Sequence, residues 1–128
     1  MATQEDVRRI ALSLPGVTEA EVHFGFGLSL KGKQKGFVWA WNERVDPKRA
    51  KVPNLGVLAV RVASLSAKEL LLSSDDGAIF TDPHYNGFPA VLVRLEQIGI
   101  EDLENLIVEA WRCMAPKDLL RQLDGSPT

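Results

Sequence analysis

The segment Phe80–Leu119, FTDPHYNGFPAVLVRLEQIGIEDLENLIVEAWRCMAPKDL, decides the fold of this 128-residue chain. Its polar start at 82–87 contains the Pro and Asn-Gly residues that favour a tight turn. Residues 89–95 then alternate between two faces, which is the two-residue period of a strand. Apolar residues next recur at the three- and four-residue steps of an amphipathic helix: Leu103, Leu106, Ile107, Ala110, Trp111 and Met114. A buried strand and the long helix that must cover it are predicted to form the centre of the core.

The rest of the chain shows shorter periodic stretches around this segment. In residues 37–41, alternation predicts that Phe37, Trp39 and Trp41 share one side of a strand. Residues 42–54 have no period and predict a long exposed loop. The other predicted elements are a helix capped by Thr3 and ended by Pro15-Gly16, strands at 21–30, 56–63 and 78–81, a short helix with a capping box at Ser66–Glu69, and a last helix near Leu119–Leu123.

This order of elements predicts the fold class. One domain, residues 1–128, is expected, because the chain is long enough to bury a core but too short for two ordinary domains. Strands and helices follow each other as α-β-β-β-α-β-β-α, in mixed runs. The sequence therefore predicts an α+β two-layer sandwich, with helices packed on one face of a five-stranded, mainly antiparallel sheet.

Composition is that of an ordinary soluble protein. Apolar residues make up 45% and charged residues 25% of the chain, and no apolar run approaches the roughly 20 residues of a membrane span. The start of the chain lacks the basic and apolar regions of a signal peptide. A lone cysteine, Cys113, has no internal disulfide partner, which fits a reducing compartment. These features predict a cytoplasmic protein.

Charge is unevenly distributed along the chain. The net charge is −2, yet residues 31–51 hold seven Lys/Arg against two Asp/Glu. Such a local basic surplus can contact nucleic-acid phosphates; the alternative is that these lysines blunt an exposed hairpin and keep a loop soluble. The candidate nucleic-acid-binding residues are Lys31, Lys33, Lys35, Arg44, Lys48, Arg49 and Lys51.

A second group of residues predicts a ligand site as an alternative. Trp39 and Trp41 share a strand face and could stack on bases or a ligand, although such a stripe also suits a core. His84 and Tyr85 lie in a turn, and loops on rigid scaffolds often carry function. The candidate ligand-binding residues are His23, Trp39, Trp41, His84, Tyr85 and Arg94.

Signatures of catalysis and of cofactor binding do not emerge from the sequence. Two distant histidines and one cysteine give no metal-ligand spacing, so no metal is expected. Gly32-Lys33-Gln34 lacks the Ser/Thr and the following helix of a phosphate loop. No nucleophile elbow or dinucleotide fingerprint is present. The sequence therefore predicts a non-enzymatic protein without a cofactor.

Two stretches of this sequence resemble the MmcQ/YjbR-like family. Residues 83–95, PHYNGFPAVLVRL, are similar to its P-H-Y-x-G-x-P-A-V-x-V-R-L stretch, and residues 110–117, AWRCMAPK, to its A-W-R-x-x-A-P-K helix end. Leu14-Pro15-Gly16-Val17 and Phe24-Gly25 resemble it too. The resemblance implies a compact α+β fold like that of secretion chaperones and frataxin-like proteins. It also implies the family's usual label, a DNA-binding protein with a double-wing arrangement of hairpins.

Two functional hypotheses follow from these observations. The first is DNA binding through the phosphate backbone at the hairpin and loop of residues 31–51. The second is a small-ligand or protein-interaction module with a cleft near His23, His84, Tyr85 and Arg94. No membrane partner is expected, and a monomer is favoured although the sequence leaves the oligomeric state open.

Overall fold

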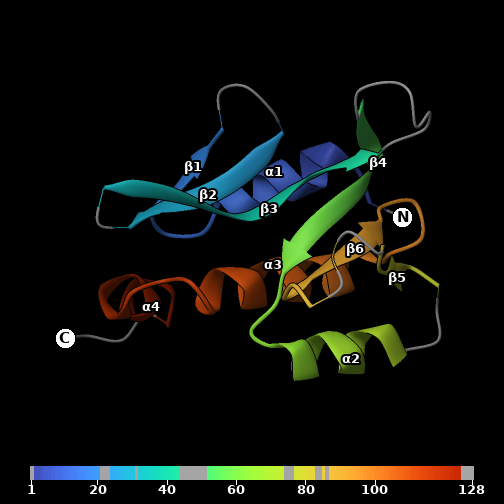
Figure 1. The fold of residues 1–128 in the computed structure, drawn as a ribbon. Coiled ribbons are helices and arrows are strands. Elements are labelled where there is room, and N and C mark those ends of the chain that lie inside the picture. The colour runs from blue at the N-terminus through green and yellow to red at the C-terminus, as the bar shows by residue number, and fades with distance from the viewer. Residues whose placement is uncertain are drawn as a thin grey trace.

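The computed structural model describes residues 2–20, 24–30, 32–43, 52–73, 77–82, 85 and 87–124. This described part of the chain contains six strands and four helices, arranged as Figure 1 shows. In chain order they are α1 (Gln4–Leu12), β1 (Val17–Glu19), β2 (Gly25–Leu30), β3 (Lys33–Glu43), β4 (Val52–Arg61), α2 (Leu65–Ser73), β5 (Ile79–Phe80), β6 (Ala90–Arg94), α3 (Ile100–Arg112) and α4 (Lys117–Asp124).

The strands form one antiparallel sheet in the order β1-β2-β3-β4-β6-β5. The predicted α+β class is therefore confirmed. The prediction of five strands is wrong, because the described residues include a sixth strand, β1, which pairs with β2 from Val17 opposite Leu28. Three residues are too short to show the alternation by which longer strands are recognised.

One face of the sheet is covered by α1 and α3, which lie on the same side in Figure 1. The predicted alternation of β6 is confirmed, because Val91 and Val93 face this side with Leu58 and Val60 of β4. The predicted apolar stripe of α3 and one side of α1 pack into this core. Its fully buried helical residues are Val7, Ala11, Leu103, Ile107, Ala110 and Trp111. Burial of apolar surface between these helices and the sheet contributes most to the stability of the fold.

Strand β3 carries a bulge that changes which way its side chains point. Phe26 lies opposite Val38, but the next residue, Gly27, lies opposite Gly36, so Phe37 is an extra residue on β3. A bulge of this kind interrupts the alternation. Phe37 and Val38 are therefore both in the helix-side core, while Trp39 belongs to a separate cluster on the other face. The prediction that Phe37 shares a side with the two tryptophans is wrong.

The strands on either side of the predicted loop at 42–54 are longer than the sequence predicts. β3 continues to Glu43 and β4 begins at Val52, with these two residues paired. The loop prediction is thus wrong at both ends, and residues 44–51 lie outside the described residues. Cross-strand pairing, which a local pattern does not register, extends both strands.

Side-chain hydrogen bonds cap the N-termini of α1 and α2. Thr3 Oγ1 accepts a hydrogen bond from the Asp6 backbone N–H, and Asp6 Oδ2 accepts one from the Thr3 N–H at 2.9 Å, so the predicted cap is confirmed. In α2, Ser64 Oγ accepts from the Ala67 N–H at 3.1 Å. The predicted capping box at Ser66 is therefore two residues too late.

Gly16 turns the chain from α1 into β1 and provides a first testable prediction. Its φ is +74°, and a Cβ there would lie 2.8 Å from Cδ1 of Leu119 in α4. Because L-residues avoid this backbone region and the neighbouring side chain must also move, Gly16→Ala should lower the free energy of unfolding by about 2 kcal/mol. Chemical denaturation measures the loss.

Gly32→Ala is the matched control for this substitution. Gly32 has a φ of +79°, but a Cβ there would meet nothing within 4 Å. This variant carries the backbone strain without the contact to Leu119, so it should lose about 1 kcal/mol. Equal losses in both variants would show that the contact of the new Cβ with Leu119 adds no cost to the backbone strain.

Candidate functional site

The sheet face opposite the helices carries a group of partly exposed aromatic side chains. Trp39 and Trp41 of β3, Phe80 of β5 and Tyr85 make up this group, which we call the aromatic face. They pack over a buried floor formed by Val57, Ala59 and Leu92. Strand alternation places the two tryptophans on the same side, and pairing of Trp39 with Ala59 brings the floor beneath them.

The rings of the aromatic face hold each other in place. Trp39 Nε1 donates a hydrogen bond to the Tyr85 hydroxyl at 3.2 Å. Trp41 meets Phe80 edge to face, with ring centroids 5.9 Å apart and an interplanar angle of 79°. The guanidinium carbon of Arg94 lies 3.9 Å from the centroid of the Phe80 ring, a cation–π distance. These contacts fix the ring orientations before any ligand arrives.

Lys68 of α2 supports the turn that carries Tyr85. Its Nζ donates to the backbone oxygens of Tyr85 at 2.6 Å and Phe88 at 2.9 Å. The side chain is only 6% exposed, and this burial lowers the pKa of Lys68 from its ordinary value. The sequence interpretation missed this residue. The signal was present, because Lys68 lies on the helix face of the apolar Leu71 and Leu72, three and four positions later.

The structure brings together four of the six candidate ligand residues: Trp39, Trp41, Tyr85 and Arg94. Arg94 packs on Phe80 and donates to the Gly77 carbonyl at 2.9 Å. His23 and His84 lie outside the described residues. Within the described ranges, no group of three or more His, Cys, Asp or Glu side chains is placed to hold a metal ion.

The basic segment 31–51 is divided by β3. Lys33 and Lys35 lie at the start of this strand, and residues 44–51 follow its end. Ten residue steps of about 3.3 Å place the two ends roughly 33 Å apart. Lys31, Arg44, Lys48, Arg49 and Lys51 lie outside the described residues. The two ends of β3 that adjoin the parts of this segment are therefore far apart, and the second part begins three residues beyond Trp41.

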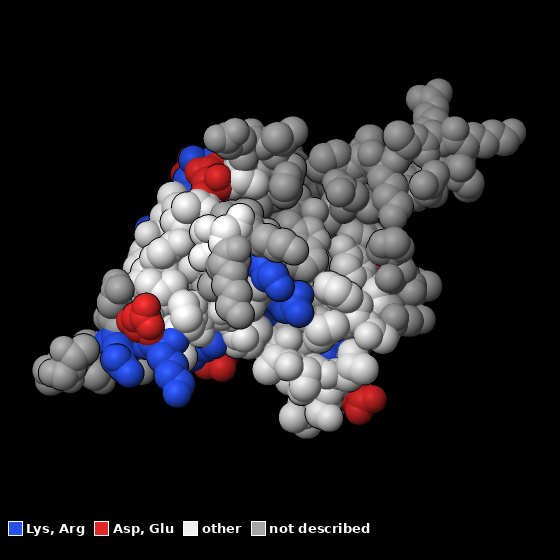
Figure 2. Space-filling model, turned by 60° about the vertical axis from the view of Figure 1, so that its left-hand side comes forward, with Lys and Arg blue, Asp and Glu red and all other residues white. Residues whose placement is uncertain are grey.

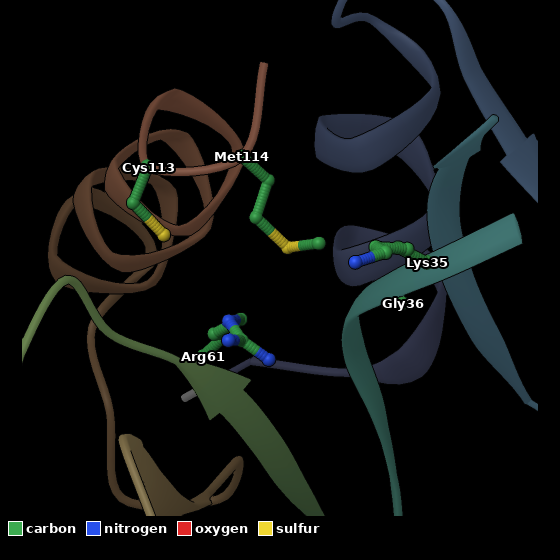
Figure 3. A pocket seen from close by; sticks show the side chains of 5 residues that line it. All are labelled: Lys35, Gly36, Arg61, Cys113 and Met114. Atoms are coloured by element: carbon green, nitrogen blue, oxygen red, sulfur yellow. The ribbon is translucent and has the colours of Figure 1, made fainter. Parts of the chain in front are cut away.

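Lys35 is exposed and belongs to a different part of the molecule from the aromatic face. It pairs with Leu28, a residue of the helix-side core, and lines a cavity of about 440 Å³ with Gly36, Arg61, Cys113 and Met114 (Figure 3). We call this the Lys35–Arg61 cavity.

Figure 2 shows that basic side chains form a small group near the middle of the molecular face in that view, without acidic neighbours in view. Positive charge is thus gathered locally in a chain with a net charge of −2.

Comparison with known proteins identifies relatives but no stated activity, and no family model matches the chain. Three curated proteins are each 38% identical over 122 residues, covering 94% of this chain and 95% of theirs. They are the uncharacterized proteins Mb2600 of Mycobacterium bovis and MT2646 and Rv2570 of Mycobacterium tuberculosis. The crystal structure of Deinococcus radiodurans DR2400, described as a DUF419 domain, matches with a TM-score of 0.67 and 20% identity, over 99% of this chain and 91% of that one. This likeness shows the fold. Among the helices of the described residues, none has the length and apolarity to cross a membrane.

Proposed function

The chain belongs to the same family as the three mycobacterial proteins, whose names state no function, and we propose from its geometry that it binds nucleic acid without catalysing a reaction. In this proposal, bases stack on the aromatic face, and the basic residues at 44–51, the second part of segment 31–51, contact phosphates. The resemblance of residues 83–95 and 110–117 to the MmcQ/YjbR-like family, which is usually labelled DNA-binding, supports the same function.

The observation that carries the proposal is the position of the aromatic face close to the strand ends that the second part of the basic segment connects. Trp41 pairs with Asn54, and two residues further on Glu43 pairs with Val52. Residues 44–51, with four Lys/Arg and one Asp, connect these two strand ends. Aromatic rings beside a basic backbone track are the arrangement that binds single strands, because every base has a π face and every nucleotide a phosphate.

A second candidate function is a small-ligand or protein-interaction module on the same face. The observation that favours it is the convergence of Tyr85 and Arg94, which sequence reasoning had already grouped, with a ring system whose orientations are fixed. A partner that uses only the rings and Arg94 would bind independently of segment 44–51. The two functions therefore differ in their dependence on salt and on the basic residues.

Fluorescence anisotropy of a labelled single-stranded oligonucleotide and a labelled duplex tests the proposal. Trp41→Leu should weaken single-strand binding about tenfold or more, since one base stack contributes roughly 1–3 kcal/mol. The double variant Arg49→Gln/Lys51→Gln should also weaken binding and make it less sensitive to salt, by about 0.7 in the log–log slope for each lost phosphate contact. Titrations at low and near-physiological salt give both quantities.

The matched control removes two charges elsewhere on the surface. Lys117 and Arg121 lie exposed on α4, so Lys117→Gln/Arg121→Gln lowers the net charge equally and should leave affinity unchanged. If the control variant binds the oligonucleotide as weakly as Arg49→Gln/Lys51→Gln, then any positive charge on the surface supports binding. That result would contradict a defined interface. Lack of binding at low salt would reject nucleic acid and leave the ligand or protein module to be tested.

A further inference from the structure

The Lys35–Arg61 cavity lies where three elements meet. Lys35 and Gly36 come from the start of β3, Arg61 is the last residue of β4, and Cys113 and Met114 follow α3. In Figure 3 the Lys35 and Met114 side chains point toward each other across the cavity, and the Arg61 guanidinium lies below them. The volume of about 440 Å³ falls in the range of roughly 300–1,000 Å³ typical of small-molecule sites.

Neither of the two cations of this cavity has a carboxylate partner among the residues that the structure describes. Among the described residues, the carboxylates within 4.0 Å of a basic side chain belong to the pairs Arg8–Glu19 and Arg9–Asp6. Neither Lys35 nor Arg61 takes part in such a pair. Two like charges facing one cavity repel each other, and an anion between them would turn that repulsion into attraction.

The other described residues that line the cavity carry no charge. Met114 is half-buried and offers a polarizable thioether to an apolar group. The Cys113 thiol donates to the Ala110 carbonyl at 3.1 Å, and its partial burial raises its pKa, although the charge of Arg61 opposes this. The thiol therefore stays protonated at neutral pH and does not act as the missing anion. Charge at one side and sulfur at the other suit a ligand with an anionic head and an apolar body.

We propose that the Lys35–Arg61 cavity binds a small organic phosphate monoester, with the phosphate on Lys35 and Arg61 and the organic part against Met114. A phosphate monoester carries a charge of about −1.5 to −2 at pH 7, which matches the two cations. Arginine adds planar, two-point recognition of phosphate oxygens. The inference does not depend on the proposed function, because the aromatic face belongs to the other cluster of the sheet.

Isothermal titration calorimetry at constant ionic strength, with phenyl phosphate as the probe, tests this site. Lys35→Gln should weaken binding about tenfold, and since Lys35 is exposed the variant should fold normally. Arg61→Gln should weaken binding at least as much. Met114→Ala should weaken the binding of phenyl phosphate but leave the binding of inorganic phosphate unchanged. Lys117→Gln, an exposed lysine outside the cavity, is the control and should bind like the unmodified protein.

The unique cysteine reports where the probe binds. Cys113 is exposed and is the single cysteine of the chain, so its alkylation by iodoacetamide can be followed directly. Bound phenyl phosphate should slow this reaction, whereas an oligonucleotide on the aromatic face should not. Benzoate that binds as tightly as phenyl phosphate would overturn the choice of phosphate, and equal binding of inorganic phosphate would overturn the organic part. Absence of both binding and protection would reject the site, whatever the oligonucleotide titrations show.

Discussion

Replacing Trp111 by alanine should lower the free energy of unfolding by about 4 kcal/mol, the largest single effect expected in this chain. The side chain of Trp111, near the end of α3, is fully buried in the helix-side core. Its Nε1 also donates to the Pro15 carbonyl at 2.9 Å, so one side chain connects α3 to the turn after α1. Domains of this size are stable by about 5–15 kcal/mol, so the variant should be close to unfolding.

Trp111→Phe separates the two contributions of this side chain. Phenylalanine keeps most of the buried volume but leaves the Pro15 carbonyl without its donor, which should cost about 1–2 kcal/mol. Urea denaturation followed by circular dichroism gives both free energies. A loss below about 1 kcal/mol for Trp111→Ala would contradict the placement of this residue in the core.

Lys68→Met should produce the second large effect, a loss of about 2 kcal/mol at neutral pH. Methionine fills similar space but removes one of the donors of the Tyr85 and Phe88 backbone oxygens, which keep the backbone N–H groups of Phe88 and Ala90. The turn that carries Tyr85 should loosen, and the Trp39–Tyr85 hydrogen bond with it. Near-UV circular dichroism should report this change together with the loss of stability.

The same substitution should alter the dependence of stability on pH. Burial holds the pKa of Lys68 in the folded protein below 10.5, its ordinary value in the unfolded chain. Between these two values the unfolded chain binds more protons, so the contribution of this group to stability rises with pH. This contribution to stability is fully present above pH 10.5 and is lost as the pH falls through the pKa of Lys68 in the folded protein. A neutral amine still has two hydrogens for the two carbonyls.

The stability difference between the unmodified protein and Lys68→Met should therefore grow as pH rises toward 10.5. Denaturation at several pH values measures this difference. Other groups titrate in both proteins, so their effects cancel in the difference. Lys117→Met, an exposed lysine on α4, should give no pH-dependent difference. A difference that shrinks with pH would mean that the ammonium form of Lys68 stabilises the fold.

Local patterns predicted the elements whose side chains alternate or recur over several turns. The strand at 90–94 and the apolar stripe of α3 follow from sequence spacing, because each buries one continuous face. β1 was missed since three residues carry too little pattern, and the position of Phe37 depends on a bulge that pairing with β2 creates. Such a bulge is a property of two strands together, so neither strand alone predicts it.

The candidate sites show the same division between local and long-range information. Alternation placed Trp39 and Trp41 on one side of β3, whereas Tyr85 and Arg94 were assigned to a cleft with the two histidines, and no sequence pattern placed them beside the tryptophans. Arg61 and Lys68 were missed. Their environments come from residues far along the chain, such as the carbonyl of Phe88, twenty positions beyond Lys68. Contacts of this range are decided by the complete sheet.

The lengths of the outermost strands have a consequence for association with other chains. β1 has three residues and β5 has two, and these strands occupy the two edges of the described sheet. An exposed edge is a template on which a further strand can add through backbone hydrogen bonds, and short edges offer little of it. The sheet should therefore resist edge-to-edge aggregation and should not capture extended peptides by strand addition.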